Sequence, residues 1–379
     1  MSEIRSVLVV GGGIGGLTAA LALKRRGIEA EVVEINATWS VYGVGIIQPS
    51  NMLRALAHIG LGERCLALGF GFPGWRIHDA NGQLLAQVPN ENVAAPGYPP
   101  INGITRPALH KILSEATLAQ GTRVRLGITV AEWTDRGERI QARFTDGSIG
   151  HYDLIIGADG AHSTVRSRLF EAALRPQATG QSVWRYNFKR PRDLLWGSLY
   201  YGATSKAGLV PLSEELMYLL LVTMEPGHPR MPAEQLHRLL RERLREYGGL
   251  IAELSEQIVD PHAVVYRPME TLLVPPPWHR GRVLLIGDAA HAGTPHLAQG
   301  AAMAIEDAVL LAELLGRPGD LSHTLECFAA RRLPRCRLVM DVGLKLGEWE
   351  MAEWHGRRAP DTDHGGLLHD TLAKLALPI

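Results

Sequence analysis

The sequence predicts an α/β protein in which a parallel-sheet domain is interrupted by an inserted, mostly antiparallel β-sheet domain and followed by a C-terminal helical segment. Three observations predict this class. Apolar strand-like runs alternate with helical segments in the first part of the chain, β-rich sequence with one helix fills about 176–270, and the strand and helix pattern then returns. A length of 379 residues also exceeds that of a usual single domain, so we expect two domains.

Composition narrows the class of protein. The chain is 46% hydrophobic and 21% charged, which is typical of a globular protein with a large core. Its net charge of zero predicts neither a nucleic-acid partner nor binding to an anionic membrane, and no apolar run reaches the length of a membrane span. The three cysteines, Cys65, Cys327 and Cys336, lack the spacing of a metal site, so we expect reduced thiols in a cytoplasmic protein and no metal.

The first predicted unit is strand, helix, strand. A short apolar run at 6–10 predicts a buried strand, and 17–27 predicts a helix that ends in basic residues and a glycine. A second strand is predicted at 30–34. It ends in Glu34, whose carboxylate can accept hydrogen bonds from ribose hydroxyls.

Glycines connect the first strand to its helix. Gly11 permits a tight turn, Gly13 lets the backbone approach a pyrophosphate, and Gly16 lets the helix pack against the strand. The helix N-terminus then presents unpaired N–H groups to phosphate. Because strand, glycines, helix, second strand and acid follow in this order, the segment predicts a Rossmann-like dinucleotide site.

Similar patterns divide the remaining chain. Thr105 and Pro107 are typical of a helix start, and Asp146-Gly147 is a hairpin turn signal. Predicted strands lie at 75–78, 124–127, 140–144, 153–160, 182–186, 216–222 and 282–286; predicted helices start at about 52, 104 and 163 or lie at about 232–247, 303–315 and 333–354; and loops are predicted at 43–51 and 95–100.

These elements suggest three parts. A discontinuous cofactor-binding domain comprises 1–75, 101–175 and 271–325, a substrate-binding domain comprises 76–100 and 176–270, and a helical segment comprises 326–379.

A second glycine-containing segment, 287–300, identifies the dinucleotide. Asp288 follows a predicted strand and can bond a sugar or ribityl hydroxyl. Gly300 and Ala301 begin a long helix, where small residues let a planar ligand sit close and the positive helix end can stabilise an anionic reduced flavin. The segment therefore predicts FAD. We expect His291 to be structural, whereas His296 faces either the flavin and substrate pocket or solvent.

Three motifs together resemble a known family. They are Gly11–Gly16 with Glu34, Asp159-Gly160 with Arg166, and the 287–300 segment. Their order and spacing resemble the single-component FAD-dependent aromatic hydroxylases, the 4-hydroxybenzoate hydroxylase-like class A flavoprotein monooxygenases. Within them the chain is most similar to the salicylate, 6-hydroxynicotinate and urate hydroxylase branch. It departs from the family in having Ala298 where a glycine usually stands before Gln-Gly.

The resemblance implies a cofactor, a reaction and a set of contacts. NAD(P)H would reduce FAD, dioxygen would form a flavin C4a-hydroperoxide, and a small electron-rich aromatic or N-heteroaromatic ring would be hydroxylated in a monomer or homodimer. NADH or NADPH would bind only transiently, because no second dinucleotide fold is evident. The implied FAD-binding residues are Gly11, Gly13, Gly16, Glu34, Gly45, Arg106, Asp159, Asp288, Pro295, Gly300 and Ala301.

The inserted sheet should supply the substrate contacts. Tyr218 is the first catalytic candidate, since a phenol can bond a substrate hydroxyl or relay its proton. His296 and Gln48 are the other two catalytic candidates. Arg185 and Lys206 are alternatives for pairing a substrate carboxylate, although surface or structural charges are the more common role for such residues.

Other activities remain open. The same flavin site also serves epoxidases and Baeyer–Villiger oxygenases acting on natural products, and a non-catalytic FAD-binding module is a further alternative. A flavin-dependent halogenase is disfavoured because the WxWxIP pattern is absent. A plain NAD dehydrogenase is disfavoured by the second flavin segment.

Overall fold

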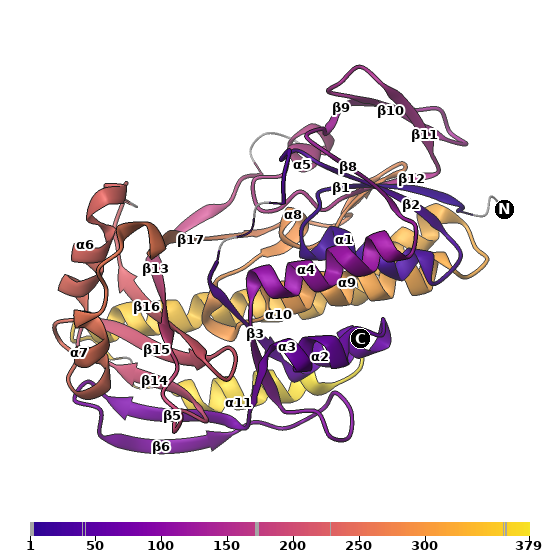
Figure 1. Cartoon of the computed structure of the whole chain (residues 1–379). Helices are drawn as coiled ribbons and strands as arrows, with labels where there is room; N and C mark the ends of the chain where they lie inside the picture. Colours follow the sequence, from indigo (N-terminus) through magenta and orange to yellow (C-terminus); the bar gives the residue numbers. More distant parts are fainter. Residues whose placement is uncertain are drawn as a thin grey trace.

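Two large β-sheets dominate the computed structural model, which describes residues 4–39, 41, 43–170, 174–227, 229–358, 360 and 362–379 (Figure 1). The first sheet has six strands in the order β18-β19-β12-β1-β2-β8. All neighbours are parallel except β18 and β19. Its strands are β1 (Ser6–Val10), β2 (Glu29–Glu34), β8 (Arg123–Leu126), β12 (Leu154–Gly157), β18 (His279–Arg280) and β19 (Val283–Leu285).

Helices cover one side of this parallel sheet and a small sheet covers the other (Figure 1). The central strands β1, β12 and β19 are almost continuously apolar, because both of their faces are buried, whereas β2 and the edge strand β8 carry charged residues. The covering elements are α1 (Ile14–Lys24), α4 (Arg106–Ala119) and α9 (Gly300–Leu315) on one side, and β9 (Val130–Asp135), β10 (Ile140–Phe144) and β11 (Ile149–Tyr152) on the other. The α/β class and the first strand–helix–strand unit predicted from the sequence are confirmed.

The second sheet has seven strands in the order β17-β13-β16-β15-β14-β5-β6. Every neighbouring pair is antiparallel except β14 and β5. The strands are β5 (Gly74–Asp79), β6 (Leu84–Pro89), β13 (Gln177–Lys189), β14 (Gly197–Tyr201), β15 (Ser205–Pro211), β16 (Leu216–Met224) and β17 (Val265–Leu273). The mostly antiparallel character predicted for the inserted region is thus confirmed.

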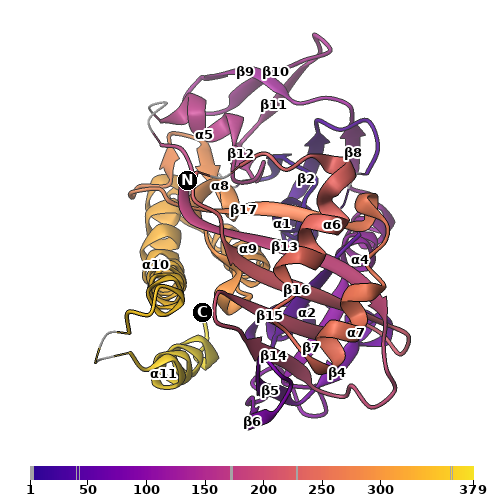
Figure 2. The ribbon, with the colours of Figure 1, turned by 90° about the vertical axis from the view of Figure 1, so that its left-hand side faces the viewer.

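Helices α6 (Leu236–Arg243) and α7 (Gly249–Glu256) lie over one face of this sheet (Figure 2). They are flanked by the short 3-10 helices η1 (Ala233–Gln235) and η2 (Pro261–Ala263). The helix predicted at about 232–247 is present as η1 and α6 but ends at Arg243, and a second helix that was not predicted begins at Gly249, which adopts φ +53°. A positive φ at this glycine interrupts the helical path.

Side-chain alternation gives the seven-stranded sheet two different faces. Trp184 and Tyr186 of β13 pack into the apolar core under α6 and α7. Arg185 lies between them in sequence and therefore projects to the opposite face. Strand pairing places Lys206 of β15 and Tyr218 of β16 on that same face, because Lys206 pairs with Val222 and Arg185 pairs with Leu220. Three polar side chains are thus directed away from the helices.

A third sheet, β3-β7-β4, packs against this polar face. Its strands are β3 (Gly45–Pro49), β4 (Phe70–Phe72) and β7 (Ile101–Thr105), and helices α2 (Ser50–His58) and α3 (Gly62–Leu68) follow β3. The predicted loop at 43–51 was wrong, because 45–49 pairs in register with 101–105. Flanking glycines and a proline suggested a loop, but burial of the short apolar run makes it a strand.

The C-terminal region is helical, as predicted. Helix α10 (Leu321–Trp354) is 34 residues long and runs from α9 to β13 and β17, and α11 (His364–Ala376) packs beside it (Figure 1). Three short elements, α5 (Thr164–Leu169), α8 (Asp288–His291) and the 3-10 helix η3 (Pro295–Leu297), complete the fold.

None of the helices in the described ranges combines the length and apolar character needed to cross a bilayer.

Candidate functional site

The turn between β1 and α1 is closed by its glycines. A Cβ added at Gly11 would overlap the carbonyl oxygen of Ala158, and one added at Gly16 would overlap that of Gly11. Gly11 also adopts φ +112°. By contrast, a Cβ at Gly13 would meet nothing within 4 Å. The turn is therefore packed on the protein side and open beside Gly13, where the α1 N-terminus carries no acidic residue and suits an anion.

Glu34 lies at the end of β2, beside this turn. Its Oε2 accepts a hydrogen bond from the Gly12 backbone N–H at 2.8 Å. Its Oε1 accepts from the backbone N–H of Asn36 at 3.0 Å and from the Asn36 side chain at 2.6 Å. A carboxylate has about four acceptor positions, so capacity for a ribose hydroxyl remains.

Asp288 opens α8, directly after Gly287 and close to the end of β19. Burial of its carboxyl group raises the pKa of Asp288 above its ordinary value, while His291 and Arg106 act in the opposite direction. The residue as a whole is nevertheless exposed, so a ligand can reach it.

A buried ion network supports the 287–291 segment from below. Asp307 of α9 accepts hydrogen bonds from the Gly287 N–H at 2.8 Å, His291 Nε2 at 2.6 Å and Arg332 Nε at 2.6 Å. Arg332 Nη1 also donates to Glu306 at 2.8 Å. His291 is thus structural, as expected from the sequence.

The same network includes a cluster with metal-ligand chemistry. His291, Asp307 and Cys336 offer possible ligand atoms within 4.8 Å of one another. Both carboxylate oxygens of Asp307 are, however, engaged by His291 and Arg332. A guanidinium bound to the central carboxylate opposes a metal cation there, so we interpret the cluster as an ion-pair network.

The loop 294–300 connects this network to α9. Ala298 has φ +53° and ψ +30°, the left-handed conformation that a glycine adopts without strain. The backbone thus keeps the shape that the family's usual glycine would allow, at a cost of about 1 kcal/mol for the alanine. Pro295 is exposed, and a Cβ at Gly300 would meet nothing within 4 Å. The start of α9 is therefore open to a planar ligand.

Arg106 begins α4 after the capping residue Thr105, whose Oγ1 accepts from the Ala108 N–H at 3.2 Å. The Arg106 guanidinium makes no hydrogen bond or ion pair with any residue in the described ranges. Its charge opposes the rise in the pKa of Asp288 and of Tyr218 and adds to the fall in the pKa of Arg185, so Arg106 is within electrostatic range of all three groups.

Arg185 and Tyr218 come together on the polar face of the seven-stranded sheet. Burial lowers the pKa of Arg185, and Arg106 lowers it further. Burial raises the pKa of Tyr218 to about 12, although both arginines oppose the shift. Within the described part of the chain, neither side chain has a hydrogen-bond partner or a carboxylate partner. Arg185 and Tyr218 therefore lie together without a carboxylate partner, and Arg106 is within electrostatic range of both.

Gly45 makes the position of Tyr218 sterically possible. A Cβ at Gly45 would overlap the Tyr218 ring. Gln48, three residues further along the same strand, is fully buried, and its side-chain oxygen accepts a hydrogen bond from Asn102 Nδ2 at 2.7 Å. Its catalytic role stays a prediction, and its contacts are those of a packing residue.

Asp159 and His296 also have clear structural contacts. Asp159 accepts from Ser163 Oγ at 2.5 Å and from the Thr164 N–H at 2.7 Å, so it caps α5. The His296 side chain is only 1% exposed and is directed toward Glu350 of α10, so it does not face solvent. Its catalytic role likewise stays a prediction.

These residues fit FAD. One end offers an open glycine turn with Glu34, the other an open helix start with Asp288, and an unpaired Arg106 lies beside it.

Comparison with known proteins decides the family. A profile described as "FAD binding domain" matches residues 5–342. YetM of Bacillus subtilis (strain 168), provisionally named an FAD-dependent monooxygenase, is 33% identical over 347 residues, covering 90% of this chain and 93% of YetM. The 6-hydroxynicotinate 3-monooxygenase of Pseudomonas fluorescens is 30% identical over 364 residues, covering 90% and 91%.

The chain belongs to the single-component FAD-dependent aromatic hydroxylases.

A solved structure supports the same family assignment. The crystal structure of Klebsiella pneumoniae HpxO complexed with FAD and uric acid matches with a TM-score of 0.81 and 25% identity, covering 98% of this chain and 92% of that one. This member of the family is therefore an FAD-dependent monooxygenase, as the sequence motifs predicted, and its cofactor is FAD.

Three residues that support the candidate site were not predicted from the sequence. Asp307, Arg332 and Glu350 carry no local motif, and each meets its partners only through the tertiary fold. The sequence did indicate Arg185, because a charged residue interrupts an apolar strand pattern there. The sequence could not show that Arg185 has no carboxylate nearby.

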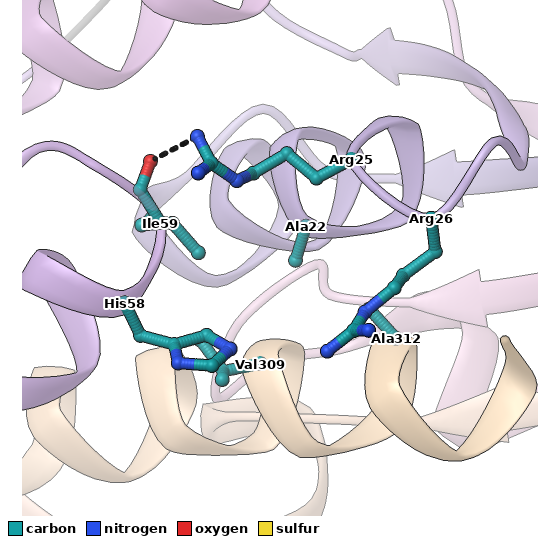
Figure 3. A pocket seen from close by; sticks show the side chains of 7 residues that line it. All are labelled: Ala22, Arg25, Arg26, His58, Ile59, Val309 and Ala312. Atoms are coloured by element: carbon teal, nitrogen blue, oxygen red, sulfur yellow. Dashed lines mark hydrogen bonds between the residues drawn. The ribbon is translucent and has the colours of Figure 1, made fainter.

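One further pocket lies outside the flavin residues. It has a volume of about 240 Å³ and is lined by Ala22, Arg25, Arg26, His58, Ile59, Val309 and Ala312 (Figure 3). Arg25 donates to the Ile59 carbonyl at 3.0 Å. The pocket lies at the C-terminal end of α1, about 16 Å of helix from the turn that suits pyrophosphate. We assign it no role in FAD binding.

Proposed function

We propose that the chain uses NAD(P)H and dioxygen to hydroxylate a small, electron-rich aromatic or N-heteroaromatic substrate that carries an acidic group. The observation that carries this proposal is that Arg185 and Tyr218, within electrostatic range of Arg106, have no carboxylate partner in the described part of the chain. Arg185 is partly buried, and a partly desolvated cation without a counter-ion is unfavourable, so an anionic ligand at this position would be favoured.

FAD, when bound, supplies the redox chemistry by accepting a hydride and activating dioxygen. The chain supplies binding and orientation. We propose that Gly11, Gly13, Gly16 and Glu34 hold the adenosine and pyrophosphate end. The residues proposed for the ribityl and flavin end are Asp288, Pro295, Gly300 and Ala301, with Gly45, Arg106 and Asp159 nearby.

Tyr218 and Arg185 would orient the substrate. At neutral pH a phenol with a pKa of about 12 is protonated, so Tyr218 would donate a hydrogen bond to the substrate's ring oxygen. Arg185 would pair with a carboxylate on the same ring. Leu220, which pairs with Arg185 across the strands, would help keep water from the ring.

The proposed division into a FAD-binding part and a substrate-binding part is supported by the sheets. Strands β5 and β6 belong to the same sheet as β13–β17, although nearly a hundred residues separate them in sequence. On this division, the substrate would lie on the β13–β16 face that carries Arg185.

A ligand panel tests the proposal. Salicylate, 3-hydroxybenzoate and 6-hydroxynicotinate are compared with their uncharged amides, and consumption of NADH or NADPH is scored against hydroxylated product. We expect at least one acid to accelerate nicotinamide oxidation strongly and its amide to be poor. If neither nicotinamide reduces the FAD with any ligand, the hydroxylase proposal fails, whereas equal rates with acids and amides contradict only the acidic substituent.

Arg185→Met gives the matching variant, and Lys189→Met is its control. Lys189 is an exposed cation at the end of the same strand. Loss of a buried charge pair is worth roughly 2–5 kcal/mol, so Arg185→Met should raise KM for the acid at least 30-fold. The control should leave KM unchanged, and the amide should hardly respond to either change.

A further inference from the structure

Four buried side chains meet where the seven-stranded sheet, the 294–300 loop and α10 come together. We call Gln181 of β13, Lys206 of β15, His296 of η3 and Glu350 of α10 the Glu350 cluster. None of the roles proposed above uses the cluster as a whole. It nevertheless joins the sheet that carries Arg185 to the loop that carries Pro295.

Glu350 is the centre of this cluster. Its Oε1 accepts from Lys206 Nζ. Its Oε2 accepts from Gln181 Nε2 at 3.2 Å and lies 3.1 Å from His296 Nε2. The other ring nitrogen of His296 is 2.9 Å from Thr294 Oγ1. The Glu350 carboxylate of α10 thus contacts side chains from β13, β15 and η3.

The charges in the cluster are matched. Burial opposes ionisation of Glu350, but Lys206 and the hydrogen bond from His296 outweigh it and hold the pKa of Glu350 well below its ordinary value. Burial likewise opposes the charge on Lys206, but Glu350 raises the pKa of Lys206 above its ordinary value. Lys206 is therefore occupied by Glu350 and differs from Arg185, whose charge is free for a ligand.

Helix α10 is shaped to receive this loop. A Cβ at Gly347 would lie 2.6 Å from Gln181 Oε1 and 3.3 Å from His296 Cε1. A Cβ at Gly343, one turn earlier, would lie 2.5 Å from Thr294 Oγ1. Larger residues at either position would push the loop away from the helix. The close approach and the Glu350 contacts act on the same segment.

Stability alone is a weak explanation for such a cluster. A buried ion pair often adds little to stability compared with apolar residues of similar volume, but it allows only one geometry. Here that geometry fixes the 294–300 loop relative to Lys206, which lies on the same sheet face as Arg185 and Tyr218. Oxygen transfer requires the flavin and the substrate ring to be held at a fixed separation.

We infer that Glu350 is a positioning residue that holds the 294–300 loop against the substrate-facing sheet and so sets the distance between flavin and substrate. The inference rests on the proposed function, because that function places the flavin at this loop and the substrate at Arg185. It predicts that loss of Glu350 separates flavin oxidation from hydroxylation.

The test compares Glu350→Gln with Glu348→Gln on the FAD-loaded protein. Glu348 is an exposed carboxylate on the same helix, so the chemical change is identical. With the best acid of the panel, we expect the fraction of NAD(P)H oxidation that yields hydroxylated product to fall at least threefold in Glu350→Gln, with hydrogen peroxide making up the difference. Glu348→Gln should match the unmodified protein.

A second measurement needs no substrate. The midpoint potential of the bound FAD is measured against a reference dye. In Glu350→Gln it should shift by at least about 30 mV, which for two electrons corresponds to a tenfold change in the ratio of reduced to oxidised FAD at a given potential. This measurement remains valid if the panel contains no substrate. Failure of the proposed function and failure of this inference are therefore distinguishable.

Glu350→Gln leaves the Lys206 charge buried and unpaired, which can prevent folding. The double variant Lys206→Met/Glu350→Gln removes both charges and avoids this problem. We expect it to bind FAD yet show the same loss of product yield and the same shift in potential. A folded double variant with the product yield and potential of the unmodified protein would overturn the inference, because the cluster would then serve folding alone.

Discussion

Single residues determine how the substrate face can act. Gly45 of the three-stranded sheet has no side chain where the Tyr218 ring of the seven-stranded sheet lies, so this glycine makes room for the ring. Burial then keeps the Tyr218 phenol protonated by raising its pKa to about 12. Arg185 lies on the same face and has no carboxylate partner in the described part of the chain. A donor and a cation are thus held ready in one place.

Replacing Tyr218 by Phe removes the donor while keeping the ring. We expect kcat for hydroxylation to fall at least tenfold, because a hydrogen bond to a developing charge contributes roughly 1.5–3 kcal/mol. The loss should be independent of pH between 6 and 9, since a phenol with a pKa of about 12 stays protonated throughout this range. Steady-state rates of product formation across this range check both statements.

Tyr186→Phe is the matched control, because Tyr186 directly follows Arg185 in β13, so it lies on the opposite face and packs under α6 and α7. It should retain full activity. Equal losses in the two variants would indicate a general effect on the sheet and contradict the role of Tyr218.

At the scale of elements, α8, α9 and α10 are joined by buried charges. Asp307 and Glu306 of α9 bind Arg332 of α10, and Asp307 also holds His291 and the Gly287 N–H of the α8 turn. The two ends of α10 therefore act on the flavin region in different ways. Its first half secures the Asp288 segment and its last turns secure the 294–300 loop.

His291 of α8 should make the stability of the protein depend on pH. Burial opposes its charged form, but Cys336 and Asp307 outweigh burial and raise the pKa of His291 well above 6.5. A group whose pKa is raised in the folded state stabilises fully below its unfolded value, and the contribution is lost as pH rises toward the folded value. Stability should therefore fall by up to about 1.4 kcal/mol per pH unit above about pH 6.5.

Urea unfolding of the FAD-loaded protein at pH 6 to 8.5 measures this slope. His291→Gln should be less stable at pH 6 and should lack the extra decline above pH 6.5. His262→Gln, at an exposed histidine, should follow the unmodified protein. Parallel curves for His291→Gln and the unmodified protein would show that His291 is uncharged in the folded state.

At the scale of the whole molecule, the sequence was most informative where chemistry depends on neighbours in the chain. The β1–α1–β2 unit, the Thr105 cap and the α9 start were readable because propensity, glycines and motif agree within about 30 residues. The short strand β3 was missed because its glycines and proline indicate a loop, and only pairing with β7 makes it a strand.

Long-range contacts explain what the sequence left hidden. Lys206 and Glu350 are 144 positions apart, and His296 and Glu350 are 54 apart. No spacing rule connects such positions, because the sheet, η3 and α10 meet only after the entire chain has folded. The mismatch at Ala298 was visible in the sequence, but its left-handed backbone was not. Tyr218 was found from its place in a strand, whereas the counter-charge that Arg185 lacks needed the folded structure.

The two glycine segments should bind different ends of FAD, and thermal unfolding of the FAD-stripped protein can separate them. ADP reports on the Glu34 end, FMN on the Asp288 end and FAD on both. Because one linked ligand occupies both ends, FAD should have a much lower Kd than either fragment and should stabilise the protein far more at equal concentration; at 100 times its Kd the stabilisation is about 2.7 kcal/mol.

Two shape-conserving variants assign the ends. Glu34→Gln should weaken ADP and FAD by roughly tenfold, about 1.4 kcal/mol, and leave FMN unchanged, whereas Asp288→Asn should weaken FMN and FAD and leave ADP unchanged. Glu34 ends β2 and Asp288 follows β19 in the same six-stranded sheet, so a general loss of folding would instead lower the response to all three ligands. Equal weakening of ADP and FMN by either variant would therefore contradict a site built from two chemically distinct halves. Selective weakening would show that this fold brings together two recognition elements 271 residues apart in the chain to hold one cofactor.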